Sequence, residues 1–195
     1  MFDKLFNLPA HPLLIHAPIV LLPIAAIATV VLVAKPAWRA RASWWMVGGL
    51  FVIVVLLFGA KESGEALIEA YDRANGEGAV DISQHQDLAE TTLLLTLAWF
   101  AVFGLLTVLE RGTHRRRVGV LKAVASNVIA RQIVAVAAAV LGVLATVWLI
   151  RTGHEGAKSV WGPRVDILFP ERQPAAATES LSRGYTPVTT PLQCL

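Results

Sequence analysis

The sequence predicts an all-α fold: a four-helix transmembrane bundle with an extramembrane helical cap on its outer side and a disordered C-terminal tail. Of the 195 residues, 55% are hydrophobic and only 16% are charged, and the mean hydropathy is +0.60. Four apolar runs reach or approach the roughly 20 residues that a helix needs to cross a bilayer. A soluble domain is rarely so apolar. We therefore expect one membrane domain over residues 1–170 and a flexible tail over residues 171–195.

The four predicted spans lie at residues 12–34, 43–60, 91–109 and 128–150. The first span lacks the basic leading segment and the small-residue cleavage site of a signal peptide, so we expect it to be retained. The lone cysteine, Cys194, excludes an intramolecular disulfide and a Cys-based haem-attachment motif.

The charged residues predict how the spans are oriented in the membrane. Basic residues gather in two connections, residues 35–42 and 110–127, whereas the connection 61–90 is acidic and has only Lys61 and Arg73 as bases. The positive-inside rule places the two basic connections in the cytoplasm and both termini outside the cell membrane. Because the basic residues form no continuous stripe, membrane lipid rather than nucleic acid is the expected partner.

The acidic connection carries helical signals of its own. KESGEALIEAYDR at residues 61–73 keeps apolar residues at helical spacing, which predicts that the second helix continues beyond the bilayer. Ser83 and Gln86 fit a capping box, which would start the third helix early and place His85 in its first turn. These extensions form the predicted helical cap. No internal repeat is visible in the sequence.

Four of the five histidines fall on the predicted outer side. His11 and His16 lie at the first span, His85 precedes the third and His154 follows the fourth, whereas His114 lies in a basic connection. Histidines from separate helices at similar depth are how helical bundles hold a haem or a metal ion. We therefore hypothesise an outer-side site for b-type haem or a transition metal.

The candidate ligands follow from position and chemistry. His16 is the strongest candidate, because an imidazole inside an apolar run needs a partner or a function. The candidate haem ligands are His16, His85, His154 and His11; the candidate metal ligands are His16, His85, His154, Glu62 and Glu65.

Each histidine also has a structural explanation. His11 precedes Pro12 and fits the start of a helix, and His16 could hydrogen-bond a neighbouring helix. His85 could be only a polar residue in an exposed first turn. His154 could complement the dipole at a helix C-terminus.

Three functions are compatible with these observations. The first is electron transfer or metal handling at the histidine cluster. The second is a non-catalytic structural or accessory subunit of a membrane complex, and the third is a small proton-linked transporter. The third ranks last because the second, third and fourth spans have no ionisable residue at mid-depth. No phosphate-binding loop, GxSxG or HExxH occurs, so nothing requires an enzyme.

Four segments resemble the bacterial membrane-protein family known as domain of unknown function 2231. They are HPLLIHAPI near the N-terminus, SGEAL after the second span, SQHQDLAE opening the third and TGHEGAKSVWG closing the fourth. The family opening typically reads HPxxVHFPI, so Ile15 and Ala17 replace its valine and phenylalanine. Its ending commonly reads G-x-x-G-G-x-L-V-Y, from which Ala157 and Trp161 depart.

The resemblance covers roughly residues 8–165 and implies a membrane protein of uncharacterised function. Some family members occur joined to, or near, Rieske-type or other electron-transfer proteins. The resemblance thus implies b-type haem or other redox work, with a redox protein or membrane complex as a partner.

Overall fold

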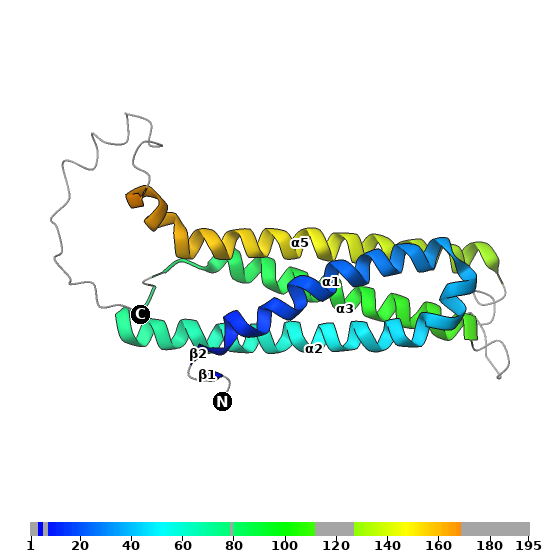
Figure 1. Cartoon of the computed structure of the whole chain (residues 1–195), viewed down its shortest axis with the longest axis horizontal. Coiled ribbons are helices and arrows are strands. Elements are labelled where there is room, and N and C mark those ends of the chain that lie inside the picture. The colour runs from blue at the N-terminus through cyan, green and yellow to red at the C-terminus, as the bar shows by residue number, and fades with distance from the viewer. Residues whose placement is uncertain (1–3, 6–7, 79, 112–126, 169–195) are drawn as a thin grey trace. The chain divides into compact units, whose positions relative to one another are not determined.

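The computed structural model describes residues 4–5, 8–78, 80–111 and 127–168, and the side chains of residues 10–78, 80–111 and 127–162. The helices are α1 (Ala10–Ala34), α2 (Pro36–Asn75), α3 (Ser83–Arg111) and α5 (Val128–Leu168) (Figure 1). A two-residue antiparallel pair, β1 (Lys4–Leu5) and β2 (Leu8–Pro9), precedes α1. The all-α prediction is confirmed. The predicted tail, residues 171–195, and most of the second basic connection lie outside the described residues.

All four helices are long and apolar enough to cross a membrane. Many large apolar side chains in them are exposed, including Ile27 and Ile133, which is the expected surface of a helix that contacts lipid. The second and third helices extend beyond the predicted spans, to Asn75 and from Ser83 respectively. The chain divides into two compact units, Met1–Gly156 and Ala157–Leu195, and the bundle described below belongs to the first.

Local sequence signals explain where the helices begin and end. Pro36 occupies the first turn of α2, where its missing N–H costs nothing. At the other end, Gly76 has a φ of 97°, and its backbone N–H donates to the Asp72 carbonyl at 2.8 Å. This left-handed conformation is tolerated well by glycine, so the helix stops there.

The start of α3 is capped differently from the prediction. Ser83 is the first helical residue, and both its backbone N–H and its hydroxyl donate to Asp81 Oδ1, at 3.0 and 2.7 Å. The predicted capping box of Ser83 with Gln86 is therefore wrong, although the predicted starting residue is right. The carboxylate of Asp81 supplies the acceptor for the start of the helix.

Asp81 gives this helix start a pH dependence. The Ser83 backbone N–H, and then its hydroxyl, lower the pKa of the Asp81 carboxyl below its ordinary value of 3.8. The stabilisation that the Asp81 carboxylate gives to the start of α3 is thus complete above the pKa of the unfolded chain, about 3.9. It is lost as the pH falls through the lower pKa of the folded protein. We expect hydrogen-exchange protection at the start of α3 to drop below that pH in the wild type, and to be weaker and insensitive to this transition in Asp81→Ala. Equal protection in the two proteins at neutral pH would contradict this role.

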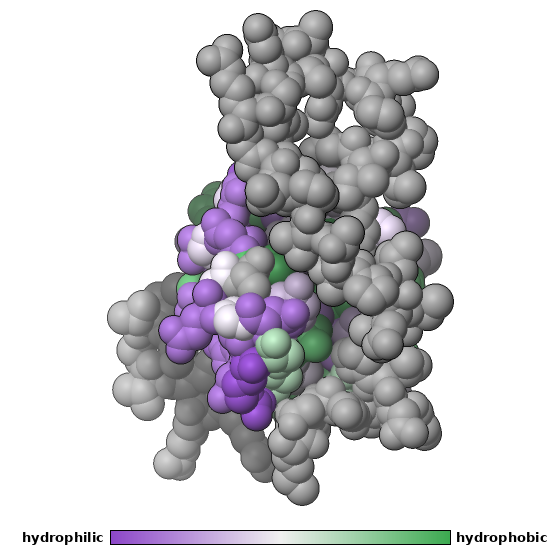
Figure 2. Space-filling view, turned by 90° about the vertical axis from the view of Figure 1, so that its left-hand side faces the viewer, coloured by the Kyte–Doolittle hydropathy of each residue, from purple (hydrophilic) through white to green (hydrophobic). Residues whose placement is uncertain are grey.

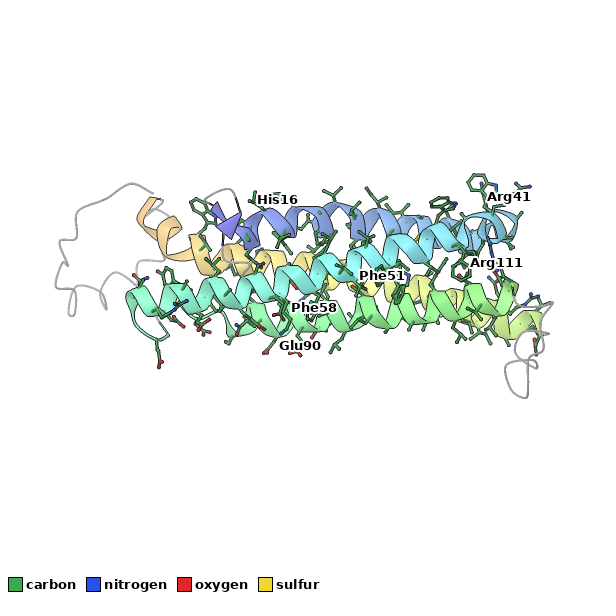
Figure 3. All side chains as sticks on the ribbon, turned by 90° about the horizontal axis from the view of Figure 1, so that it is seen from below. His16, Arg41, Phe51, Phe58, Glu90 and Arg111 are labelled. Carbon is green, nitrogen blue, oxygen red and sulfur yellow. The ribbon has the colours of Figure 1, made fainter. Side chains whose placement is uncertain are left out.

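The helices enclose one core. In two perpendicular views α1 and α3 lie on opposite sides of the bundle, with α2 and the first-unit part of α5 between them (Figures 1 and 3). The largest fully buried side chains are Trp99 and Phe103 of α3, which pack in the same cluster as residues of the other three helices. Chain segments from all four helices therefore meet around the axis of the bundle.

The burial pattern reveals an internal repeat that the sequence reading missed. Five of the seven buried positions of α2 recur in α5 at identical spacing, which indicates that the α1–α2 hairpin and the α3–α5 hairpin are two versions of one unit. The matched buried residues are Ser43, Leu50, Ile53, Leu57 and Ala60 in α2, and Ala135, Gly142, Ala145, Leu149 and Thr152 in α5. In α1 and α3 the matched buried residues are Pro18, Leu22, Thr29 and Leu32, and Thr92, Thr96, Phe103 and Leu106.

Residue size explains why this repeat is hidden. Where the first hairpin has Leu50 in α2, the second has Gly142 in α5, and a Cβ on Gly142 would lie 2.9 Å from the ring of Trp99. The position in α1 that corresponds to Trp99 is occupied by Ala25. Large and small residues have thus exchanged places between the hairpins, so the equivalent core positions differ in sequence.

An ion pair between Arg39 and Glu110 closes one end of the bundle. Arg41 and Arg111 lie at the same end (Figure 3), which we call the arginine end. Arg39 Nη2 lies 2.6 Å from Glu110 Oε1, and the side chains are only 5% and 16% exposed. Arg39 Nη1 also donates to the carbonyls of Leu32 and Val33 at the end of α1. One guanidinium thereby connects α1, α2 and α3.

Candidate cofactor site

Four histidines lie at the opposite end of the bundle, which we call the histidine end: His11, His16, His85 and His154. Exposed acidic residues are carried by the adjoining ends of α2 and α3 and by the turn between them, namely Glu62, Glu65, Glu69, Glu77, Asp81, Asp87 and Glu90. In the end-on view, hydrophilic residues gather on this face (Figure 2). The predicted histidine cluster is thus located at one polar end, but its members have very different surroundings.

His11 is held by α2. Its Nδ1–H donates to the Ala60 carbonyl at 2.8 Å, and the hydroxyl of the buried Ser63 lies 3.5 Å from the same nitrogen. The ring lies directly against Gly64, where a Cβ would be only 3.0 Å from His11 Nδ1. These contacts fix the orientation of the half-buried ring and assign its proton to Nδ1.

His85 is held in the same way by α5. Its Nδ1–H donates to the Thr152 carbonyl at 2.9 Å, and the ring lies against Gly156, where a Cβ would be 2.9 Å from Nδ1 and Cε1. The Thr152 hydroxyl in turn lies 3.1 Å from the Thr92 hydroxyl of α3. Ala60 and Thr152 are equivalent positions of the internal repeat, and so are Gly64 and Gly156.

The rings of His11 and His85 are neighbours in an edge-to-face arrangement. Their centroids are 6.5 Å apart and their planes are inclined by 86°. Because each Nδ1 is bound to a carbonyl, each Nε2 is the nitrogen with a free lone pair, and neither has a hydrogen-bond partner within the described part of the chain. The structure therefore brings together two of the four predicted haem ligands, His11 and His85, as an oriented pair.

The other predicted ligands lie apart from this pair. His16 is exposed, its Nδ1 contacts the carbonyl of Pro12 in its own helix, and Figure 3 shows it at the edge of the bundle opposite α3. His154 and Glu62 are also exposed. Glu65 pairs with Lys61 one turn earlier. Among the described residues, no group of three or more His, Cys, Asp or Glu side chains is placed to hold a metal ion. His114 lies outside the described residues.

The sequence reading missed the residues that orient the pair. They are the carbonyls of Ala60 and Thr152 and the glycine Gly64; Gly156 was visible in the sequence as a small residue that would allow the close approach of a ligand or of another helix. The signal available in the sequence was a glycine in SGEAL and another in HEGAK, each in a helix that follows a histidine-bearing helix. Without the rotation of each helix, however, nothing connects a glycine to a particular ring.

Comparison with known proteins supports the membrane assignment. The family described as predicted membrane protein (DUF2231) matches residues 7–168. No curated protein and no solved structure matches the chain. The matched region begins before α1 and ends at the last residue of α5, so it includes both hairpins and the histidine pair. The chain therefore belongs to the family of predicted membrane proteins with domain of unknown function 2231.

Proposed function

We propose that His11 and His85 are the two axial ligands of a b-type haem and that the protein transfers electrons. The observation that supports this proposal is the oriented imidazole pair, 6.5 Å between centroids, with both Nδ1 atoms bound to carbonyls. A histidine that ligates a metal almost always donates its other N–H to a carbonyl, carboxylate or water. Both rings have this arrangement.

The separation of the rings suits one ion between them. Two imidazoles on opposite sides of an ion, each with a metal–nitrogen bond of about 2.0–2.1 Å, have centroids about 6.3 Å apart. The observed separation is 6.5 Å, at the upper end of the range for two aromatic rings in edge-to-face contact. The centroid separation therefore supports the proposal that one iron atom is held between the two rings.

The number of ligands favours haem over a bare metal ion. Zinc sites in proteins use three or four protein ligands. The porphyrin of a haem supplies four nitrogens, so the protein needs to supply only two axial ligands. The described residues offer two oriented imidazoles and no third ligand group beside them. When bound, the haem supplies one-electron redox chemistry.

We further propose that the histidine end faces outward. Lys35, Arg39 and Arg41 lie in or beside the α1–α2 connection at the arginine end, and Arg115–Arg117 follow α3 in the sequence. Under the positive-inside rule that side is cytoplasmic, which places both termini and the histidine pair outside the cell membrane. A redox protein on that side would be the electron-exchange partner.

The test is the haem content and the oxidised and dithionite-reduced spectra of the purified protein, expressed with a haem precursor. We expect one haem per chain with the sharp reduced bands of a six-coordinate b haem. The His11→Ala and His85→Ala variants are each expected to lose most of the bound haem, because one of the two proposed imidazole ligands is removed. His16→Ala and His154→Ala are matched controls and should retain it, since both side chains are exposed.

Three outcomes would overturn this proposal. The first is a folded wild-type protein that takes up no haem during expression or on addition of haemin, which would make the pair a structural connection between hairpins. The second is loss of haem in the control variants to the same extent. The third is stoichiometric zinc or copper, detected by metal analysis of the same samples and lost in both His11→Ala and His85→Ala.

A further inference from the structure

We infer that Gly64 and Gly156 are positioning residues of the histidine site, one contributed by each hairpin; this inference rests on the proposed function. The internal repeat places them at equivalent points of α2 and α5. Each follows by one helical turn the residue whose carbonyl accepts the imidazole N–H. Each hairpin thus supplies one ligand, one acceptor carbonyl and one glycine to a single shared site.

The role of the glycines is to let each ring lie on the backbone of the neighbouring helix. At Gly64 a Cβ would lie 3.0 Å from His11 Nδ1 and 3.1 Å from Cε1. At Gly156 a Cβ would lie 2.9 Å from both Nδ1 and Cε1 of His85. A methyl group at either position would push the ring away from the helix and lengthen its hydrogen bond to the carbonyl.

Displacement of the ring matters because the hydrogen bond and the ligand position are coupled. Ring orientation is set by the Nδ1–H bond, and the loss of such a partner typically lowers metal affinity about 10–100-fold. The ring centroids are only 6.5 Å apart, so moving one ring by a few tenths of an ångström also moves its Nε2 atom relative to the other ring. Any residue larger than glycine should therefore displace the rings and disturb the site, although His11 and His85 themselves are unchanged.

The same two helices contain matched control glycines. Gly59 precedes Gly64 in α2, and Gly153 precedes Gly156 in α5, yet no atom lies within 4 Å of a Cβ built on either control. A Gly→Ala change at any of the four positions has the same small effect on intrinsic helix stability. Only the contact with the imidazole differs between the test and control positions.

The experiment measures haem affinity by titration with haemin, together with the midpoint potential of the bound haem. We expect Gly156→Ala and Gly64→Ala to weaken haem binding about 10–100-fold, with the larger effect at Gly156, and to shift the midpoint potential. Gly59→Ala and Gly153→Ala should match the wild type in both measurements. The potential reports ligation of the bound haem, so a general loss of stability would not move it.

The outcomes separate this inference from the proposed function. If the wild type binds haem and His11→Ala and His85→Ala do not, but the test glycine variants match their controls, then the positioning role is wrong and the haem site stands. If the wild type binds no haem, the proposed function is wrong and the positioning role falls with it. A weakened affinity confined to Gly64→Ala and Gly156→Ala supports both.

Discussion

Replacing Glu110 by alanine is expected to lower the free energy of unfolding by about 3–5 kcal/mol, because the change leaves Arg39 buried without its counter-charge. The two side chains are 5% and 16% exposed, and the Arg39 Nε and Nη2 atoms both donate to the carboxylate of Glu110. Equilibrium unfolding in mixed detergent micelles measures the effect. The closest control is Glu65→Ala, which breaks an exposed pair with Lys61 and should cost about 0–1 kcal/mol.

A double variant separates the charge effect from packing. Replacing Arg39 and Glu110 together by methionine and leucine removes both buried charges, and such replacements are often neutral or stabilising. We expect the double variant to unfold closer to the wild type than Glu110→Ala does. An effect of Glu110→Ala no larger than that of Glu65→Ala would show that the pair does not hold α1, α2 and α3 together.

The second large effect is expected at Trp99 and Gly142. Trp99→Ala removes the largest fully buried side chain and should cost about 3–5 kcal/mol, because a cavity remains. Gly142→Leu should cost about 1–3 kcal/mol or more through overpacking, since a Cβ alone would lie 2.9 Å from the Trp99 ring. The same unfolding measurement applies to both variants.

The internal repeat predicts that these two changes compensate. Trp99→Ala with Gly142→Leu gives the second hairpin the pair that the first already has, Ala25 with Leu50. Residues in contact are non-additive, and we expect the double variant to be more stable than Trp99→Ala alone. A double variant whose loss equals the sum of the single losses would contradict the equivalence of the two hairpins.

The helices could be predicted from the sequence because the signals that define them are local. Four apolar runs, Pro36 at a helix start and the glycine-containing turn after Asn75 all act over a few residues. The extensions of α2 and α3 followed from helical spacing in the same way. The acceptor at the start of α3 was misassigned because Asp81 and Ser83 both have suitable side chains, and sequence alone does not tell which is the acceptor.

The identity of the histidine pair could not be predicted, because it depends on how each helix is rotated. His11 and His16 are five residues apart and so lie about 140° apart around a helix of 3.6 residues per turn. In a soluble helix the apolar stripe would show which of them faces inward. A membrane helix is apolar on the lipid side as well, so α1 carries no such stripe. For this reason His16, rather than His11, was ranked as the strongest candidate ligand.

The internal repeat was hidden for a related reason. The exchange of Leu50 and Ala25 for Gly142 and Trp99 removes the sequence similarity at these core positions, and only a few equivalent residues, such as His11 and His85, are identical. The repeat becomes visible only when buried positions are compared.

The most direct test of the proposed site is electron paramagnetic resonance of the oxidised, haem-loaded protein. The proposed haem site predicts a low-spin ferric signal with the strong anisotropy that two nearly perpendicular imidazole planes produce, since the rings of His11 and His85 are inclined by 86°. A high-spin ferric signal in the wild type, or a low-spin signal unchanged by both His11→Ala and His85→Ala, would show that these two histidines are not the axial pair.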